Sequence, residues 1–247
     1  MKTISLTILL LITATSVHAQ EISCLCDTIR DNPFKPELTG ERFIWSKTGS
    51  VYFNTDFVNG DIKLINGEWV DNIALKYNGF IDEVIMFNTE IGKQIKLDKK
   101  FIQEFRFNDP QRNMSQNFKK VTTGLLSDSA EIFIQVLLED RISLFVFRKI
   151  GITGYENKSL NGGMFGIEIY SPIPEYILGF PGGRIESFNR IKRKEIIKSF
   201  PGKEESIKEI FRRNHIWRIK DEPGLIDVIE LLNKDYFSNL LSVGNQK

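Results

Sequence analysis

The sequence predicts an α+β protein in which an antiparallel, β-rich body, a roll or open barrel of hairpins, precedes a C-terminal helical portion. Three observations support this fold class. Apolar and polar residues alternate over much of residues 51–180, the period of two that half-buried strands require. Asn66-Gly67 separates two alternating runs and is a strong hairpin signal. After Pro181-Gly182-Gly183, apolar residues recur every three or four positions, which favours helices.

The same patterns divide the 247 residues into four parts. We expect a signal peptide over 1–19, an irregular segment over 20–47, the β-rich body over 48–183 and the helical portion over 184–247. The segment over 20–47 contains Asn32-Pro33 and Lys35-Pro36, which interrupt any helix. Phe43, Ile44 and Trp45 are expected to lead into the first sheet.

The first residues have the parts of a secretory signal peptide. Lys2 precedes an apolar run from Ile4 to Ile12, and Val17-His18-Ala19 provides a small-residue cleavage site. The apolar run is too short for a mature transmembrane helix, although an uncleaved anchor is the alternative interpretation. Cleavage after Ala19 would leave an exported protein of the periplasm or outer envelope. We find no second apolar run of spanning length, so the sequence predicts no transmembrane span in the mature chain.

Charge and cysteine content limit the partners of the mature chain. The whole chain has 33 Lys and Arg residues against 32 Asp and Glu residues, so it has no overall attraction to nucleic acid. Cys24 and Cys26 are the only cysteines. An exposed or mutually bonded pair is the simplest interpretation; metal or redox roles, lipidation and intermolecular pairing are the alternatives.

The first half of the body is expected to form strands in close succession. Ile62 and Leu64 lie before the Asn66-Gly67 turn, and Trp69 and Val70 follow it. In the next strand, Ile73, Leu75 and Tyr77 lie on one face. The continuous apolar run Val84–Phe87 predicts a strand that is buried on both faces. Two more strands, Ile95–Leu97 and Gln103–Phe107, are linked by the polar turn Asp98-Lys99-Lys100. Residues 108–117 contain Pro110 and are expected to form a loop.

The second half of the body is expected to contain two further hairpins. In the first, Ile132, Ile134, Val136 and Leu138 form one face, Glu139-Asp140 makes a tight turn, and Ile142, Leu144 and Val146 return. Gly151–Gly163 is rich in Gly, Asn and Ser, which favours a loop. The second hairpin pairs Phe165–Tyr170 with Tyr176–Phe180 around Pro172 and Pro174.

The helical portion is expected to contain three helices. The first is lined by Ile191, Ile196, Ile197 and Phe200 and ends at Pro201-Gly202; the second is lined by Ile207, Ile210 and Phe211. An extended link, Ile216–Ile219, leads to Asp221, a good N-cap residue that is followed by Pro223 in the first turn. Leu225, Val228, Ile229 and Leu232 then form the apolar stripe of the third helix.

We predict no catalytic, cofactor-binding or metal-binding residues. A Cys–His pair would have to use Cys24 or Cys26 with His215, the only mature histidine, and no G-x-S-x-G motif occurs. Metal sites lack histidine and cysteine ligands, although a carboxylate-only Ca²⁺ site stays open. The carboxylate pairs Asp82-Glu83 and Glu204-Glu205 and the glycine pairs Gly162-Gly163 and Gly182-Gly183 have structural explanations.

Two surfaces could bind a ligand. Twelve Lys and Arg residues between 184 and 220, with Arg190, Lys192, Arg193 and Lys194 as a cluster, form either a solvated helix face or a surface for membranes or polyanions. The aromatic residues of the first strands either belong to the core or line a ligand groove: Tyr52, Phe53, Phe57, Trp69, Tyr77, Phe80 and Phe87.

Two sets of residues outline a β unit and the segments that follow it. They are Tyr52-Phe53-Asn54, Gly60, Leu64, Gly67 and Leu75-Lys76-Tyr77-Asn78; and Val136-Leu137, Ile142-Ser143-Leu144, Lys194–Phe200 and Ile207–Phe211. This pattern resembles that of uncharacterised exported envelope proteins of the Bacteroidota. The resemblance implies a β scaffold over most of the mature chain and no assigned activity. Glu139-Asp140 replaces the Asp-Gly turn of that pattern.

We therefore expect an exported envelope protein that is not an enzyme and needs no cofactor. Its function would be structural, or it would bind another protein, a glycan or a lipid surface of the envelope. The alternative hypothesis is a carboxylate-dependent hydrolase that acts on an envelope polymer, which requires two carboxylates about 5–10 Å apart across a cleft.

Overall fold

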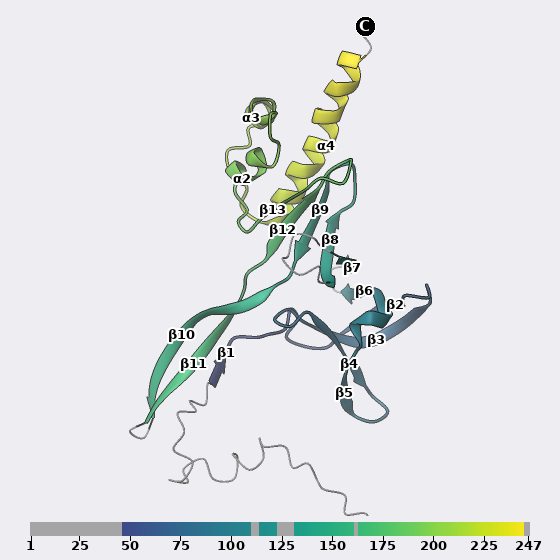
Figure 1. Cartoon of the computed structure of the whole chain (residues 1–247), viewed down its shortest axis with the longest axis vertical. Coiled ribbons are helices and arrows are strands. Elements are labelled where there is room, and N and C mark those ends of the chain that lie inside the picture. The colour runs from purple at the N-terminus through teal and green to yellow at the C-terminus, as the bar shows by residue number, and fades with distance from the viewer. Residues whose placement is uncertain (1–45, 110–113, 123–130, 161–162, 245–247) are drawn as a thin grey trace, which may run out of the picture. The chain divides into compact units, whose positions relative to one another are not determined.

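The computed structural model describes residues 46–109, 114–122, 131–160 and 163–244. These residues form a mostly antiparallel β structure followed by helices, so the α+β fold class is confirmed (Figure 1). One sheet has ten strands in the order β13-β12-β9-β8-β7-β6-β2-β3-β4-β5, and the other has three in the order β1-β11-β10. In the described part of the chain, β13 and β5 do not pair with each other, so the large sheet is open.

Most strands of the large sheet pair with a sequence neighbour. In chain order they are β2 (Val58–Leu64), β3 (Trp69–Asn78), β4 (Glu83–Asn88), β5 (Lys93–Lys96), β6 (Ile102–Asp109), β7 (Met114–Thr122), β8 (Glu131–Leu138), β9 (Ser143–Phe147), β12 (Glu175–Gly179) and β13 (Ile185–Phe188). The small sheet contains β1 (Ser46–Thr48), β10 (Ile150–Leu160) and β11 (Gly163–Pro172). The helices are η2 (Lys99–Phe101), α2 (Arg193–Lys198), α3 (Glu204–Arg213) and α4 (Glu222–Gly244).

The predicted hairpin at Asn66-Gly67 is present between β2 and β3. A two-residue Asn-Gly turn requires a positive φ at both residues, but here Gly67 has a positive φ, of +87°, and Asn66 does not. The Gly67 N–H donates to the carbonyl of Leu64 (2.9 Å), and the Leu64 N–H donates to that of Glu68 (2.8 Å). The connection is therefore longer than two residues, with Gly67 in the left-handed position that such loops reserve for glycine.

One face of β2–β8 carries an aromatic core, and we call this face the inner face. Its largest fully buried side chains are Tyr77, Phe105, Phe107, Phe118 and Phe133. The rings of Phe105 and Phe118 stack with their centroids 4.5 Å apart. Gly60 lies opposite Phe107, and a side chain there would collide with the backbone of Arg106. The predicted face of Ile73, Leu75 and Tyr77 is confirmed, with the last two fully buried.

A second core, the helix-side core, joins the helices to β9, β12 and β13. The helices contribute Ile196, Ile207, Ile210, Phe211, Leu225, Val228, Ile229 and Leu232, and the sheet contributes Leu144, Val146, Tyr176, Leu178 and Phe188. The predicted stripes of the second and third helices are thus confirmed. Asp221 caps α4 as expected, because its Oδ1 accepts the Gly224 N–H at 3.0 Å.

The predicted face of β8 holds only in part. Ile132 and Ile134 lie together in a small third cluster, but the register shifts between Val136 and Leu138. This irregularity places Leu138 opposite Leu144 of the helix-side core. The turn after β8 is also longer than Glu139-Asp140, because β9 begins only at Ser143.

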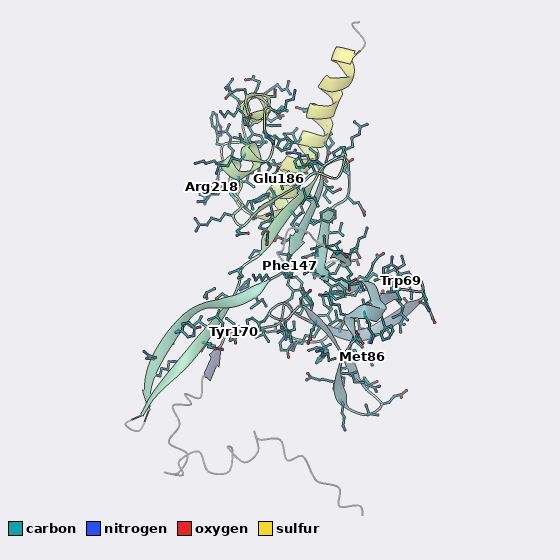
Figure 2. All side chains as sticks on the ribbon, viewed as in Figure 1. Trp69, Met86, Phe147, Tyr170, Glu186 and Arg218 are labelled. Carbon is teal, nitrogen blue, oxygen red and sulfur yellow. The ribbon has the colours of Figure 1, made fainter. Side chains whose placement is uncertain are left out.

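The strand β4 is not buried on both faces, which corrects the expectation for Val84–Phe87. Val84 is buried and Met86 packs against the aromatic core, but Ile85 and Phe87 are only half-buried. Their side of the sheet, which we call the outer face, is open to solvent here. Figure 2 labels one side chain from each face in this region: Trp69 on the outer face and Met86 on the inner face.

The predicted hairpin between Phe165–Tyr170 and Tyr176–Phe180 is wrong. The first segment lies in β11 and pairs with β10, whereas the second lies in β12 and pairs with β9 and β13. The cause is the segment predicted as a loop over 151–163: its residues up to Leu160 belong to the long strand β10, and Gly163 begins β11 (Figure 1). Residues 161–162 lie outside the described residues. The small and polar residues of β10 suit a strand whose side chains are largely exposed.

The remaining boundaries shift by a few residues. Part of the predicted loop over 108–117 belongs to β6 and β7, and 110–113 lie outside the described residues. The range from 184 begins with the strand β13, and α2 starts at Arg193 instead of enclosing Ile191. Phe43–Trp45 also lie outside the described residues. Among the described helices, none is both long and apolar enough to cross a membrane.

Candidate functional site

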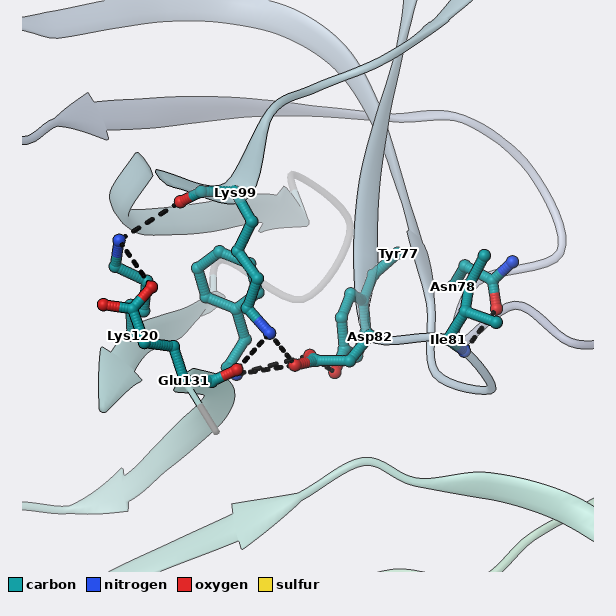
Figure 3. A network of polar contacts seen from close by, with 8 residues as sticks. Tyr77, Asn78, Ile81, Asp82, Lys99, Lys120 and Glu131 are labelled. Atoms are coloured by element: carbon teal, nitrogen blue, oxygen red, sulfur yellow. Dashed lines mark hydrogen bonds and ion pairs between the residues drawn. The ribbon is translucent and has the colours of Figure 1, made fainter. Parts of the chain in front are cut away.

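A buried polar network connects β3, the turn after it, η2 and β8 (Figure 3). Tyr77 donates its hydroxyl to Asp82 at 2.6 Å, and Lys99 forms an ion pair with the same carboxylate. Lys99 also donates to the carbonyl of Glu131, and the backbone N–H of Phe133 donates to Asp82 at 3.3 Å. The network therefore links segments that are far apart in the sequence.

Burial dominates the electrostatics of this network. It raises the pKa of Asp82 above its ordinary value, although Lys99, Tyr77 and Phe133 all favour the carboxylate form. Burial and the neighbouring carboxylate also raise the pKa of Tyr77 well above its usual range. Asp82 has a φ of +55°, a conformation that few residues other than glycine adopt. The ties to the backbone of β8 indicate a structural role for this group.

A second network lies at the start of α4. Arg148 donates from both terminal nitrogens to Glu222, at 2.7 Å for one of them, and its Nε donates to Gln135 at 2.6 Å. Tyr176 donates its hydroxyl to the same glutamate at 2.8 Å. The guanidinium also lies 5.2 Å from the ring centroid of Phe53, which packs against the aromatic core. This ion pair therefore joins α4 to the sheet between the two cores.

Arg148 reverses the usual effect of burial on Glu222. Burial alone would raise the pKa of this carboxyl, but the hydrogen bonds and charge of Arg148 outweigh it and lower the pKa. Tyr176 responds in the opposite direction, because burial and the glutamate raise the pKa of its phenol. A bidentate arginine is the geometry that holds a carboxylate most firmly.

A third network lies on the outer face. Asp61 is only 4% exposed, although Asn59 and Trp69 on the same face are exposed. Its carboxylate accepts the Nε–H of Arg106 (2.5 Å), the side-chain amide of Asn108 (3.0 Å) and the backbone N–H of Asn72 (2.8 Å). Asn72 belongs to an irregularity in β3 opposite Asp61 and has a φ of +58°.

These donors keep Asp61 ionised. Burial would raise its pKa, but the amide of Asn108, the backbone of Asn72 and Arg106 together lower it. The guanidinium of Arg106 lies 4.7 Å from the ring centroid of Trp69, which is 38% exposed. The result is a fixed layer of polar groups on the outer face, with an aromatic side chain beside it.

A groove of about 360 Å³ adjoins this layer. We call it the outer-face groove; it is lined by Asn59, Asn72, Asn88, Thr89 and Glu90, with Ile73, Ala74 and Phe87 as its apolar part. Asn59 lies opposite Ala74, and Ala74 lies opposite Phe87, so one row of residues crosses three strands. The small side chain of Ala74 leaves the space between its two larger neighbours.

Two other cavities have different character. One, of about 210 Å³, is lined mainly by apolar side chains at the open end of the aromatic core, among them Leu64, Val70, Met86 and Phe101. The other, of about 500 Å³, lies between the α3–α4 link and α4 and is lined by charged residues of both signs, including Arg218 and Asp227. His215 also lines this second cavity.

The structure separates most of the residues that the sequence singled out. Glu83 pairs with Lys96 while Asp82 belongs to the buried network, and Glu205 pairs with Lys208 in the first turn of α3. Gly182 and Gly183 both have positive φ in the turn between β12 and β13. Cys24, Cys26 and Gly162 lie outside the described residues. Among the described residues, no group of three or more His, Cys, Asp and Glu side chains could hold a metal ion.

The structure also places the two surfaces that the sequence suggested, the basic residues of 184–220 and the aromatic residues of the first strands. Most basic residues of 184–220 are exposed, and several pair with acids, as in Arg184–Glu186 and Arg213–Asp235. Some of the aromatic residues belong to the core, whereas another lines a groove. Tyr77 is in the core and Phe53 packs on it, whereas Phe87 lines the outer-face groove.

Sequence reasoning did not indicate that the charged side chains of Asp61, Lys99 and Arg148 form the centres of these networks. Each is one charged residue within an ordinary alternating or turn segment, so the period of two assigns it to solvent. The only signal for Asp61 is its position beside Gly60, where an adjacent strand approaches closely. No family model matches the chain, and no curated protein and no solved structure matches it significantly.

Proposed function

We propose that the protein is an exported protein of the cell envelope that acts by binding another molecule rather than by catalysis. The observation that supports this proposal is the network of Asp61 on the outer face. Burying a carboxylate costs free energy unless its oxygens are hydrogen bonded. A sheet face that contacts only water would gain no advantage from a buried carboxylate. Here the buried charge fixes Asn72, Arg106 and Asn108 in place.

A surface fixed in this way favours binding. Side chains that are already ordered lose less conformational entropy when a ligand arrives, which improves affinity without new contacts. The networks of Asp82 and Glu222 differ from it, because they join elements that are not neighbouring strands, whereas the partners of Asp61 lie on β3 and β6, which already flank β2. Export is supported by the residues before Gln20, which have the composition of a signal peptide.

Two measurements test this proposal. The full chain is expressed in a bacterium with two membranes, and the mature protein is analysed by mass spectrometry. We expect a first residue of Gln20, because Val17-His18-Ala19 is the cleavage signal. A protein that keeps residues 1–19 and stays in the cytoplasm would contradict export.

The second measurement is sedimentation of the mature protein with purified envelope fractions. We expect saturable retention that falls several-fold in Arg106→Gln, because this change releases Asp61 and the layer around it. Lys158→Gln, on the exposed part of β10, is the matched control and should bind normally. Release of soluble fragments from the envelope polymer during the incubation would instead support the hydrolase hypothesis.

A further inference from the structure

The outer-face groove has a floor and walls of different chemistry. Its floor is the row of Asn59, Ala74 and Phe87 across β2, β3 and β4, and the row continues to Gln94 of β5. Phe87 is half-buried, and its ring lies 5.6 Å from that of Phe57, which supports it from one side. The centre of the groove is therefore a small apolar surface bounded by amides.

The polar groups around this floor include several unused hydrogen-bonding positions. The side-chain amides of Asn59 and Asn72 make no hydrogen bond with another residue in the described part of the chain. Asn88 uses its Oδ1 to accept the N–H groups of Glu90 and Ile91, which leaves its NH₂ group as a donor. Each free amide offers a donor and an acceptor side by side.

The charges of the groove select against an anionic ligand. Glu90 is its only charged lining residue, and no lysine or arginine lines it. Among the lining residues, a phosphate or carboxylate would meet the carboxylate of Glu90 and no cation. A ligand of adjacent hydroxyl groups can both donate to and accept from the amides, and it can donate to Glu90.

The groove is also preorganised. The backbone of Asn72 is held by Asp61, and the side chain of Asn88 is fixed by two backbone donors. A volume of about 360 Å³ lies near the lower end of the range for small-ligand sites, which is about 300–1,000 Å³. A site of this size holds one or two sugar rings, with one ring lying against Phe87.

We propose that the outer-face groove binds a neutral carbohydrate chain, with its hydroxyl groups on the asparagine amides and Glu90 and the C–H face of one sugar ring against Phe87. This inference rests on the proposed binding function and names its ligand class. An open groove on one face of a sheet allows the chain to continue beyond both ends, so internal segments of a polymer can bind.

The test is a titration of the mature protein, labelled with ¹⁵N, with maltotetraose, cellotetraose and chitotetraose. We expect saturable shifts of the backbone amides of 72–74 and 87–90 with at least one of them, in the millimolar range of an isolated shallow site, about 0.1–10 mM. Tetragalacturonate, which is negatively charged, should bind at least tenfold more weakly.

Two variants assign the shifts to the groove. Ala74→Leu fills its centre and should weaken binding more than tenfold, and Asn59→Ala should weaken it several-fold. Asn157→Ala, an exposed strand asparagine of β10, is the matched control and should bind as the wild type does. Thermal unfolding of each variant shows that the fold is retained.

Three results would overturn the inference. They are no saturable shift with any neutral oligosaccharide, tighter binding of tetragalacturonate, and shifts that Ala74→Leu leaves unchanged. The envelope sedimentation separates this failure from that of the proposed function. If the protein is exported and retained but Ala74→Leu is retained equally, the groove is not the carbohydrate site, whereas the binding function stands.

Discussion

The aromatic core and the helix-side core stabilise two parts of one sheet in different ways. The aromatic core is formed largely by phenylalanine and tyrosine rings from one face of β3–β8. The helix-side core is mainly aliphatic, and α2, α3 and α4 supply half of its buried residues. A sheet without a covering helix needs large side chains to exclude water, because rings bury more area than aliphatic side chains do. Where helices cover the sheet, Ile, Leu and Val make up most of the core, and aromatic rings such as Phe188 and Phe211 are the minority.

The ion pairs of the two parts also differ, in the direction in which the pKa of the carboxyl group is shifted. Lys99 contacts Asp82 as a single point charge, and burial still raises the pKa of that carboxyl. Arg148 donates hydrogen bonds to Glu222 from two nitrogens and lowers the pKa of that carboxyl. Two differences produce the opposite directions: the side chain of Asp82 is more buried than that of Glu222, at 12% against 25% exposed, and only Glu222 has a bidentate arginine.

The largest expected effect is on the aromatic core. Phe118 is fully buried and its ring lies within 6 Å of four others, those of Phe53, Tyr77, Phe105 and Phe107. Phe118→Ala should lower the free energy of unfolding by about 3–5 kcal/mol, because it leaves a cavity that rigid rings cannot fill. Chemical denaturation measures this loss. Ile229→Ala in the helix-side core is the matched variant, with an expected loss of about 2–4 kcal/mol. Equal losses below about 1 kcal/mol would show that neither core is tightly packed.

A smaller effect is expected at the junction between the cores. Arg148→Met leaves the carboxylate of Glu222 without its cation and should cost about 2–3 kcal/mol of unfolding free energy. This is less than for a fully buried pair, because the side chain of Glu222 is 25% exposed. Arg213→Met, which removes an exposed pair with Asp235, should cost less than about 1 kcal/mol. A loss at Arg148 no larger than at Arg213 would contradict the role of this junction.

The smallest effect is the pH dependence, and its sign differs between the two carboxylates. The folded-state pKa of Asp82 is raised, so its contribution to stability is present below the unfolded pKa of about 3.9 and is lost as the pH rises through the folded pKa. The folded-state pKa of Glu222 is lowered, so its contribution is present above about pH 4.3 and is lost as the pH falls.

Denaturation curves between acidic and neutral pH should therefore respond oppositely in two variants. In Asp82→Asn, the free energy of unfolding should no longer decrease because of this carboxyl as the pH rises. In Glu222→Gln, it should no longer decrease because of that carboxyl as the pH falls. The same slope in both variants would show that the two pairs do not differ in the way the structure indicates.

The sequence by itself determined the fold class and much of the local structure. Alternation marks the strands around Leu75 and Leu144, the Gly67 turn joins β2 to β3, and the stripe from Leu225 to Leu232 marks α4. These features depend on residues close in the chain, where periodicity and turn preferences act directly. The Asp221 cap is predictable for the same reason.

Only the tertiary structure decided which strands pair and which charges become buried. The residues of β10 favour a loop locally, and their strand conformation depends on pairing with β11. Asp61 and Arg106 are 45 residues apart, and Arg148 and Glu222 are 74 apart. Such contacts form when distant strands and helices meet, and no local pattern encodes them. The outer-face groove has the same origin, because it exists only where β2, β3 and β4 bring Asn59, Ala74 and Phe87 into one row.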